Sequence, residues 1–264
     1  MMVSAPRVTS GNRSMSDASD ARPAVLPTIV GLCVALGGPF LVKFVLAPLI
    51  LESPASSSIA VLLSQSMLWL LTGTVIVVTR WWERRPWSWI GVRRISWRAA
   101  LLAAVLGVAL GIAVPILTVA TSRLLPLSKG GTVDTVAASG PAWLVLAVVL
   151  TASVTEEVLF RAYPIERLAR LTGARWPGAL LSLAAFVAFH LHGWNLGHVL
   201  GVVMPLGAVM TGLYLWRRNV VFVIITHFLL DLPARPCRTR RLGADVGGGS
   251  CWSTPPTTSC ANCF

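Results

Sequence analysis

Two adjacent carboxylates, Glu156 and Glu157, end a long apolar run, and Arg161 follows Glu157 by four residues. The chain of 264 residues has only ten acidic side chains, so a pair placed in an apolar run points to a function. Glu157 and Arg161 share one helix face, which predicts a supporting ion pair. Glu156 is turned about 100° away from Glu157 and is free to act as a base toward water.

Two later apolar runs carry further polar groups. His190 follows Phe186 by four residues, and Asp231 follows His227 by four. Two imidazoles and a carboxylate can hold Zn²⁺ and acidify its bound water, which makes His190, His227 and Glu156 candidate ligands. The same groups can instead donate or orient hydrogen bonds toward a developing oxyanion without a metal. The residues leave both arrangements open.

Apolar runs that could position these groups dominate the sequence. The chain is 55% hydrophobic and 12% charged, and its mean hydropathy is +0.73, unlike a soluble domain. A helix needs roughly 20 apolar residues to span a bilayer. The sequence therefore predicts an all-α, polytopic transmembrane helix bundle with about seven spans. The expected spans cover residues 24–50, 58–79, 99–121, 141–160, 177–192, 196–216 and 219–232.

Positive charges indicate how the spans are oriented. The net charge is +12, but the arginines lie in short segments between apolar runs, so membrane topology explains them better than nucleic-acid binding. Segment 80–98 has six arginines and five tryptophans, the expected loop 161–176 has four arginines, and Arg217 and Arg218 follow the sixth span. We expect these three segments on the cytoplasmic side with the N-terminus, in a multi-pass protein of the cell membrane.

Two expectations concern side chains near the expected loops. The tryptophans of segment 80–98 are typical of headgroup anchors, and Glu166 beside Arg167 is typical of a solvated face. Starting at residue 177, the fifth span places His190 roughly 20 Å above the cytoplasmic side, which is higher than Glu156 near the end of the fourth span. A later start of the fifth span, near residue 182, would remove most of this difference.

The chain divides into four expected parts. Residues 1–23 are a disordered cytoplasmic tail, residues 24–135 are N-terminal membrane helices, and residues 136–232 are the catalytic membrane domain. Residues 233–264 are rich in Gly, Pro and Ser and hold four of the five cysteines, which predicts an unstructured segment. It is either a genuine tail or the out-of-frame translation of a GC-rich gene, and the sequence leaves both open.

The three motifs together resemble those of the CPBP family of intramembrane proteases, also called the CAAX protease and bacteriocin-processing or Abi family, which includes the type II CAAX prenyl endopeptidase. Each motif alone is common, but the three in order, in separate apolar helices, are specific, and the resemblance covers roughly residues 140–232. They stand here as Glu156-Glu157-Val-Leu-Phe-Arg161, Phe186-Val-Ala-Phe-His190 and His227-Phe-Leu-Leu-Asp231.

The resemblance implies a bundle of commonly eight membrane helices around a conical cavity that opens to the membrane and the cytoplasm. It implies that Glu156 activates water, that His190 and His227 bind a metal or polarise the scissile carbonyl, and that Asp231 stands where the family has Asn or Asp. The residues implied to support the site are Glu157, Arg161 and Phe186.

The leading prediction is an intramembrane endopeptidase that hydrolyses a peptide bond of a membrane-associated or prenylated protein or peptide. A second possibility is a non-catalytic membrane protein of the same fold, serving bacteriocin immunity, maturation or partner binding. A third is an ion- or proton-coupled transporter, which predicts paired half-helices or an internal repeat that the sequence does not contain. A protease loses turnover on Glu156→Ala, whereas a scaffold tolerates that change.

Overall fold

The computed structural model describes residues 25–46, 48, 58–127, 140–191 and 193–232. The expected tails, residues 1–23 and 233–264, lie outside the described residues. Every regular element in the described part is helical, which confirms the all-α prediction. The N-terminal elements are α1 (Val25–Leu32), η1 (Cys33–Gly37), α2 (Gly38–Leu41), η2 (Val42–Leu46), α4 (Ser58–Val77), η3 (Val78–Trp82), η4 (Trp87–Ile90) and α5 (Trp97–Ser122).

The second half of the chain continues the bundle. Its elements are α7 (Ala142–Glu156), η5 (Glu157–Ala162), α8 (Tyr163–Thr172), α9 (Trp176–His190), α10 (Leu196–His198), η6 (Val199–Val203), α11 (Met204–Arg217) and α12 (Val220–Asp231). Five continuous helical segments are long and apolar enough to cross a membrane, and α9 and α12 are shorter apolar helices. Their positions agree with the seven spans expected from hydropathy, so the protein is a helical membrane protein.

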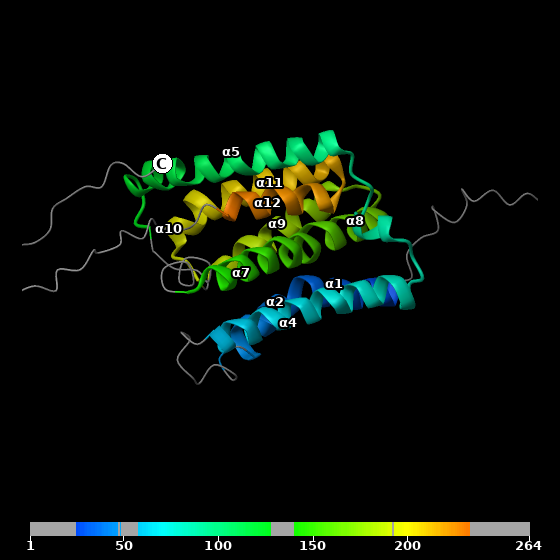
Figure 1. Cartoon of the computed structure of the whole chain (residues 1–264). Coiled ribbons are helices and arrows are strands. Elements are labelled where there is room, and N and C mark those ends of the chain that lie inside the picture. Colours follow the sequence, from blue (N-terminus) through cyan, green and yellow to red (C-terminus); the bar gives the residue numbers. More distant parts are fainter. Residues whose placement is uncertain (1–24, 47, 49–57, 128–139, 192, 233–264) are drawn as a thin grey trace, which may run out of the picture.

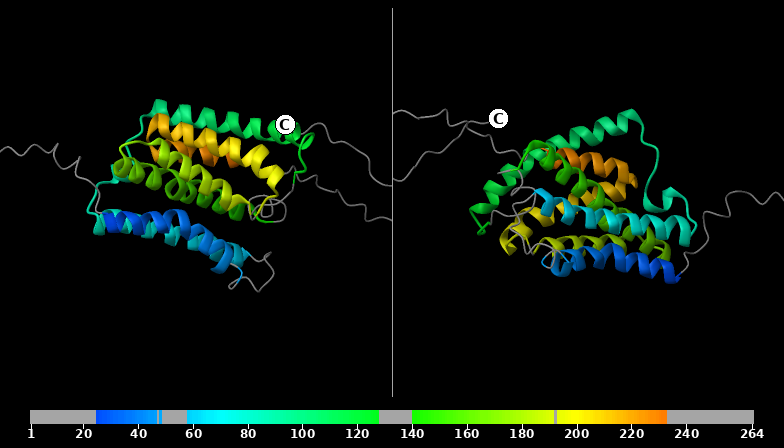
Figure 2. Two further views of the ribbon diagram at one scale, coloured as in Figure 1. Left: turned by 180° about the vertical axis from the view of Figure 1, so that it is seen from behind. Right: turned by 60° about the horizontal axis from the view of Figure 1, so that its bottom comes forward.

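The helices lie side by side, nearly along one direction (Figure 1). Helices α1, α2 and α4 form one layer, which packs against α7 and η5, and α5 lies on the far side against α12. Figure 2 shows the same order from two further directions. The segments that carry the predicted site, α7 with η5, α9 and α12, therefore lie in the middle of the bundle.

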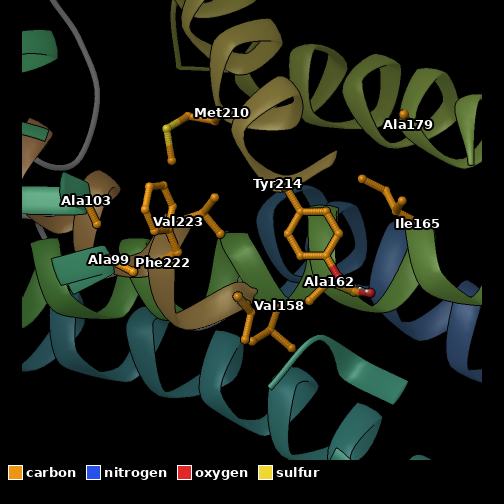
Figure 3. Close-up of a cluster of buried hydrophobic side chains, with 11 residues drawn as sticks. Ala99, Ala103, Val158, Ala162, Ile165, Ala179, Met210, Tyr214, Phe222 and Val223 are labelled. Carbon is orange, nitrogen blue, oxygen red and sulfur yellow. Dashed lines mark hydrogen bonds between the residues drawn. The ribbon is translucent and has the colours of Figure 1, made fainter. Parts of the chain in front are cut away.

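A buried apolar cluster holds this middle layer together. Figure 3 shows Val158 and Ala162 of η5 beside Phe222 and Val223 of α12, with Tyr214 of α11 above Ala162. Phe222, Val223 and Tyr214 are fully buried. Burying a large apolar side chain stabilises a protein by roughly 1.5–3 kcal/mol relative to leaving it in water. Between helices in a membrane, much of this stabilisation has to come from close van der Waals packing, because lipid is as apolar as the side chains themselves.

The fourth span is longer than the sequence predicted. The helix does not end near residue 160 but continues through η5 and α8 to Thr172, where Gly173 closes it with a φ of 77°, a conformation that glycine adopts without strain. The expected loop 161–176 was therefore wrong. Hydropathy missed this helix because α8 is polar on one side and its charges are paired inside the protein.

Buried ion pairs at the end of the bundle that carries α8 explain why this segment is a helix and not the predicted loop. Glu166 and Arg167 are buried, not solvated as predicted. Arg167 pairs with Glu83, and Glu166 Oε2 lies 2.9 Å from Arg218 Nη2. The hydrogen bond to Glu166 also raises the pKa of the Arg218 guanidinium. Partners from distant segments thus replace water around charges that the sequence alone presents as a polar surface.

Trp89 lies at the centre of the same end. It is 1% exposed, and the guanidinium groups of Arg170 and Arg85 lie 3.7 and 4.2 Å from its ring centroid. The expectation that it anchors at the headgroups was wrong, whereas the other four tryptophans of segment 80–98 are exposed: Trp81, Trp82, Trp87 and Trp97. Asn219 donates to the Arg93 carbonyl. Together with the Glu83–Arg167 and Glu166–Arg218 pairs, this bond shows that the three arginine-bearing segments meet at one end of the bundle.

Candidate active site

The two adjacent glutamates lie where the fourth helix changes its winding. Glu156 is the last residue of α7, and Glu157 opens the π-helical segment η5. π-Helical turns are rare and frequently occur at functional sites, because the wider turn redirects side chains. All six residues of η5 are buried, and the segment packs against α9, α11, α12 and the first membrane helix pair. Charges on this turn are therefore enclosed by protein.

Glu157 and Arg161 form the ion pair that their spacing predicted. Arg161 Nη1 donates to Glu157 Oε1 over 3.1 Å, and both side chains are at most 1% exposed. The Arg161 guanidinium also lies 3.9 Å from the ring centroid of Phe186 on α9, in cation–π geometry. Two helices are thus joined through one buried cation.

His227 brings α12 to the same carboxylate. Its Nδ1 lies 2.8 Å from Glu157 Oε1, and its Nε2 lies 3.4 Å from Asp231 Oδ2. A protonated imidazole satisfies this arrangement, because both ring nitrogens then donate. The Glu157 side is fully buried, whereas the Asp231 side chain is 28% exposed, so Nε2 faces the more open side.

His190 is held differently, by its own helix. Its Nδ1 lies 2.8 Å from the carbonyl oxygen of Phe186. A carbonyl oxygen can only accept, so Nδ1 carries the hydrogen, and in the neutral imidazole Nε2 then keeps a free lone pair. The Phe186 ring lies 4.4 Å from the His190 ring and also contacts Arg161. Phe186 therefore sits between the histidine and the buried cation, which gives the Phe-x-x-x-His spacing a structural reason.

Glu156 belongs to the same cluster but makes no side-chain hydrogen bond among those described. It is half-buried and interacts electrostatically with His227, Arg161 and Asp231. Because it is turned away from Glu157, it does not share the pairing that holds the buried carboxylate. Its carboxylate is therefore not held in an ion pair among the described residues, which leaves it available to take a proton.

The long fourth helix removes the depth mismatch expected between Glu156 and His190. From Glu156 the helix runs roughly 24 Å further toward the arginine-bearing end of the bundle, where it ends at Thr172, at ~1.5 Å per residue. After a short turn, α9 packs antiparallel to α8 and returns roughly 21 Å before it reaches His190. The two residues thus lie at similar depth although α9 begins at Trp176, and no later start is needed.

Lys43 is a site residue that the sequence analysis did not select. It lies in η2 of the first membrane helix, and its Nζ donates to the Phe189 carbonyl over 3.1 Å. It interacts electrostatically with Glu156 and with His190. The signal was present, because a single lysine within an apolar span is costly and by default suggests function.

The residues placed here do not fit the expected zinc site. Within the described ranges, no group of three or more His, Cys, Asp or Glu side chains is arranged to hold a metal ion. Both ring nitrogens of His227 face carboxylates, so a metal could bind this imidazole only by displacing one of these contacts.

The fold and the cluster define a class: a multi-pass helical membrane protein with a buried carboxylate–imidazole site. Residues 138–233 match the family described as type II CAAX prenyl endopeptidase Rce1-like. That stretch, which runs from just before α7 to the end of α12, is a domain of this CAAX protease family. The chain has no significant match among curated proteins or among solved structures.

Proposed function

We propose that this protein is an intramembrane endopeptidase that cleaves a peptide bond near the C-terminus of a prenylated or otherwise membrane-associated substrate. One observation carries the proposal: three helices place Glu156, His190 and His227 in a single enclosed cluster, with His227 fixed against Glu157. Ionisable groups inside a membrane bundle are costly and mark functional sites. The family of residues 138–233 supplies the reaction class.

In the proposed reaction, Glu156 removes a proton from water, and the resulting hydroxide attacks the scissile carbonyl carbon. Protonated His227 turns its Nε2–H from Asp231 to the developing oxyanion, an interaction that strengthens in the transition state. The proton held by Glu156 passes to the leaving nitrogen as the carbon–nitrogen bond breaks. His190, whose Nε2 has a free lone pair, accepts a hydrogen bond from the same water and orients it.

Three buried residues are assigned positioning roles. Glu157 fixes the imidazole of His227, as a carboxylate does for the histidine of a catalytic triad. Arg161 keeps Glu157 ionised, and Phe186 holds His190 beside the cluster. The arginine-bearing end of the bundle is assigned to the cytoplasmic side by the positive-inside rule. With Glu156 roughly 24 Å from Thr172 and about 21 Å from Ala142 along the same helix, the attacking water would lie near the middle of the bundle.

The test is cleavage of a fluorescent farnesylated peptide by the full chain in proteoliposomes. We expect Glu156→Gln to lower turnover by about 10²-fold or more, the usual contribution of a general base. His190→Gln is compared with His198→Gln, a matched change in a ring that stacks on Trp194 instead. If Glu156→Gln turns over as fast as an active wild type, Glu156 is not the base. If the wild type does not cleave the peptide, a scaffold or transporter role is favoured instead.

A further inference from the structure

We propose that Lys43 binds the terminal carboxylate of the substrate and so selects peptides cleaved close to a free C-terminus. The inference rests on the proposed endopeptidase function and assigns a specificity residue to the same site. Lys43 lies in the first membrane helix, outside the stretch that matches the protease family, residues 138–233. The N-terminal helices would then contribute directly to the site.

The ammonium of Lys43 is held in place by contacts that leave some of its N–H donors available. Nζ donates one hydrogen to the Phe189 carbonyl and lies 4.2 Å from the centre of the Phe189 ring. An ammonium has three donors, and within the described part of the chain two of them remain after this bond. Phe189 precedes His190, and the two rings lie 5.5 Å apart. The cation is therefore anchored at the end of α9, next to a proposed catalytic histidine.

The electrostatic environment places Lys43 within the cluster. It interacts with Glu156 on the fourth helix and with His190 on the fifth. Its side chain is half-buried, so it is accessible enough to meet a ligand and enclosed enough for the charge to act strongly. Among the described residues, the carboxylate that acts on Lys43 is Glu156, and Glu156 must give up its charge when it accepts the proton of water.

The chemistry of the substrate class matches this cation. In a C-a-a-X sequence the prenylated cysteine is fourth from the end, so cleavage after it releases three residues with a free carboxylate. Three extended residues span at most roughly 10 Å. A cation on a neighbouring helix, within electrostatic reach of the water-activating carboxylate, suits the far end of such a peptide.

The proposal is tested by assaying each protein variant on two substrates that differ only at the C-terminus. Two farnesylated peptides are used, one with a free C-terminal carboxylate and one with a carboxamide. Wild type is expected to cleave the carboxylate peptide with a kcat/KM about tenfold or more higher, the usual effect of a charge-assisted hydrogen bond. Lys43→Gln should cleave the two peptides with nearly equal kcat/KM, and the lost preference should appear mainly in KM. Lys43→Arg should retain much of the preference.

Controls separate binding from folding. Arg98→Gln removes an exposed cation beside Trp97 and should keep the wild-type preference. The role assigned to Lys43 would be overturned if Lys43→Gln lowered kcat/KM for both peptides by the same factor. It would also be overturned if wild type cleaved both peptides equally well. Either result would leave the proposed protease function standing. A wild type that cleaves neither peptide would overturn the proposed function and, with it, the role of Lys43.

Discussion

The imidazole of His227 lies 2.8 Å from the carboxylate of Glu157, a residue 70 positions earlier in the chain. The same carboxylate oxygen accepts from Arg161. One fully buried oxygen thus joins the fourth helix to the last described one. The neighbouring Glu156 has a different environment, so the two adjacent glutamates have separate roles: one organises the site, and the other is available for chemistry.

Removing Glu157 should destabilise the protein strongly. Glu157→Ala leaves Arg161 as a buried, unpaired charge, and breaking a buried pair in this way costs about 3–5 kcal/mol. The double variant Glu157→Ala/Arg161→Met should recover much of the stability, because the unpaired charge is gone, but no activity. Thermal unfolding in detergent micelles checks both. A double variant no more stable than the single one would show that the pair is not the cause.

Gly107→Ala should lower activity although Gly107 lies on α5, away from the site. A Cβ at this position would lie 2.6 Å from the Thr226 carbonyl oxygen, so α12 has to move. His227 follows Thr226, and a displacement near 1 Å can cost about 10²-fold in rate. Gly73→Ala is the control, since its added Cβ meets no described atom within 4 Å beyond its chain neighbours and the local backbone of its own helix. Equal turnover of the two variants would contradict this coupling.

Phe186→Leu should reduce turnover more than it reduces stability. The change removes the ring that lies between Arg161 and His190, including a desolvated cation–π contact worth about 2 kcal/mol. We expect a loss of about tenfold in kcat. Phe222→Leu removes the same volume from the apolar core, at a residue that is fully buried, and should affect mainly the melting temperature. Similar kinetic losses in both variants would mean that packing alone is responsible.

A chelator should leave turnover unchanged within about twofold. The ring nitrogens of His227 are engaged by Glu157 and Asp231, so a metal would have to displace a buried ion pair before it could bind. Proteoliposomes are assayed with and without a chelator of zinc, followed by added Zn²⁺. If the chelator lowers activity and added Zn²⁺ restores it, then His227 rotates away from Glu157 and the expected metal site forms.

Much of the architecture could be predicted because a bilayer demands long apolar helices, and hydropathy records them directly. The number of spans and the Glu157–Arg161 pair followed from composition and spacing, and the family of residues 138–233 followed from the resemblance of its three motifs. The prediction failed at α8, where Glu166 and Arg167 are buried against Arg218 and Glu83. A hydropathy window over neighbouring residues counts these side chains as exposed charges, because their partners lie 52 and 84 positions away in the chain.

The sequence by itself determined that carboxylates and imidazoles lie inside membrane helices, because the residue types and their four-residue spacings are local properties. Only the tertiary structure decided that His227 meets Glu157 rather than Glu156, and that Lys43 joins the cluster. The reason is that the direction of a side chain across a bundle depends on how each helix is rotated and how far it extends. Packing against other helices sets both.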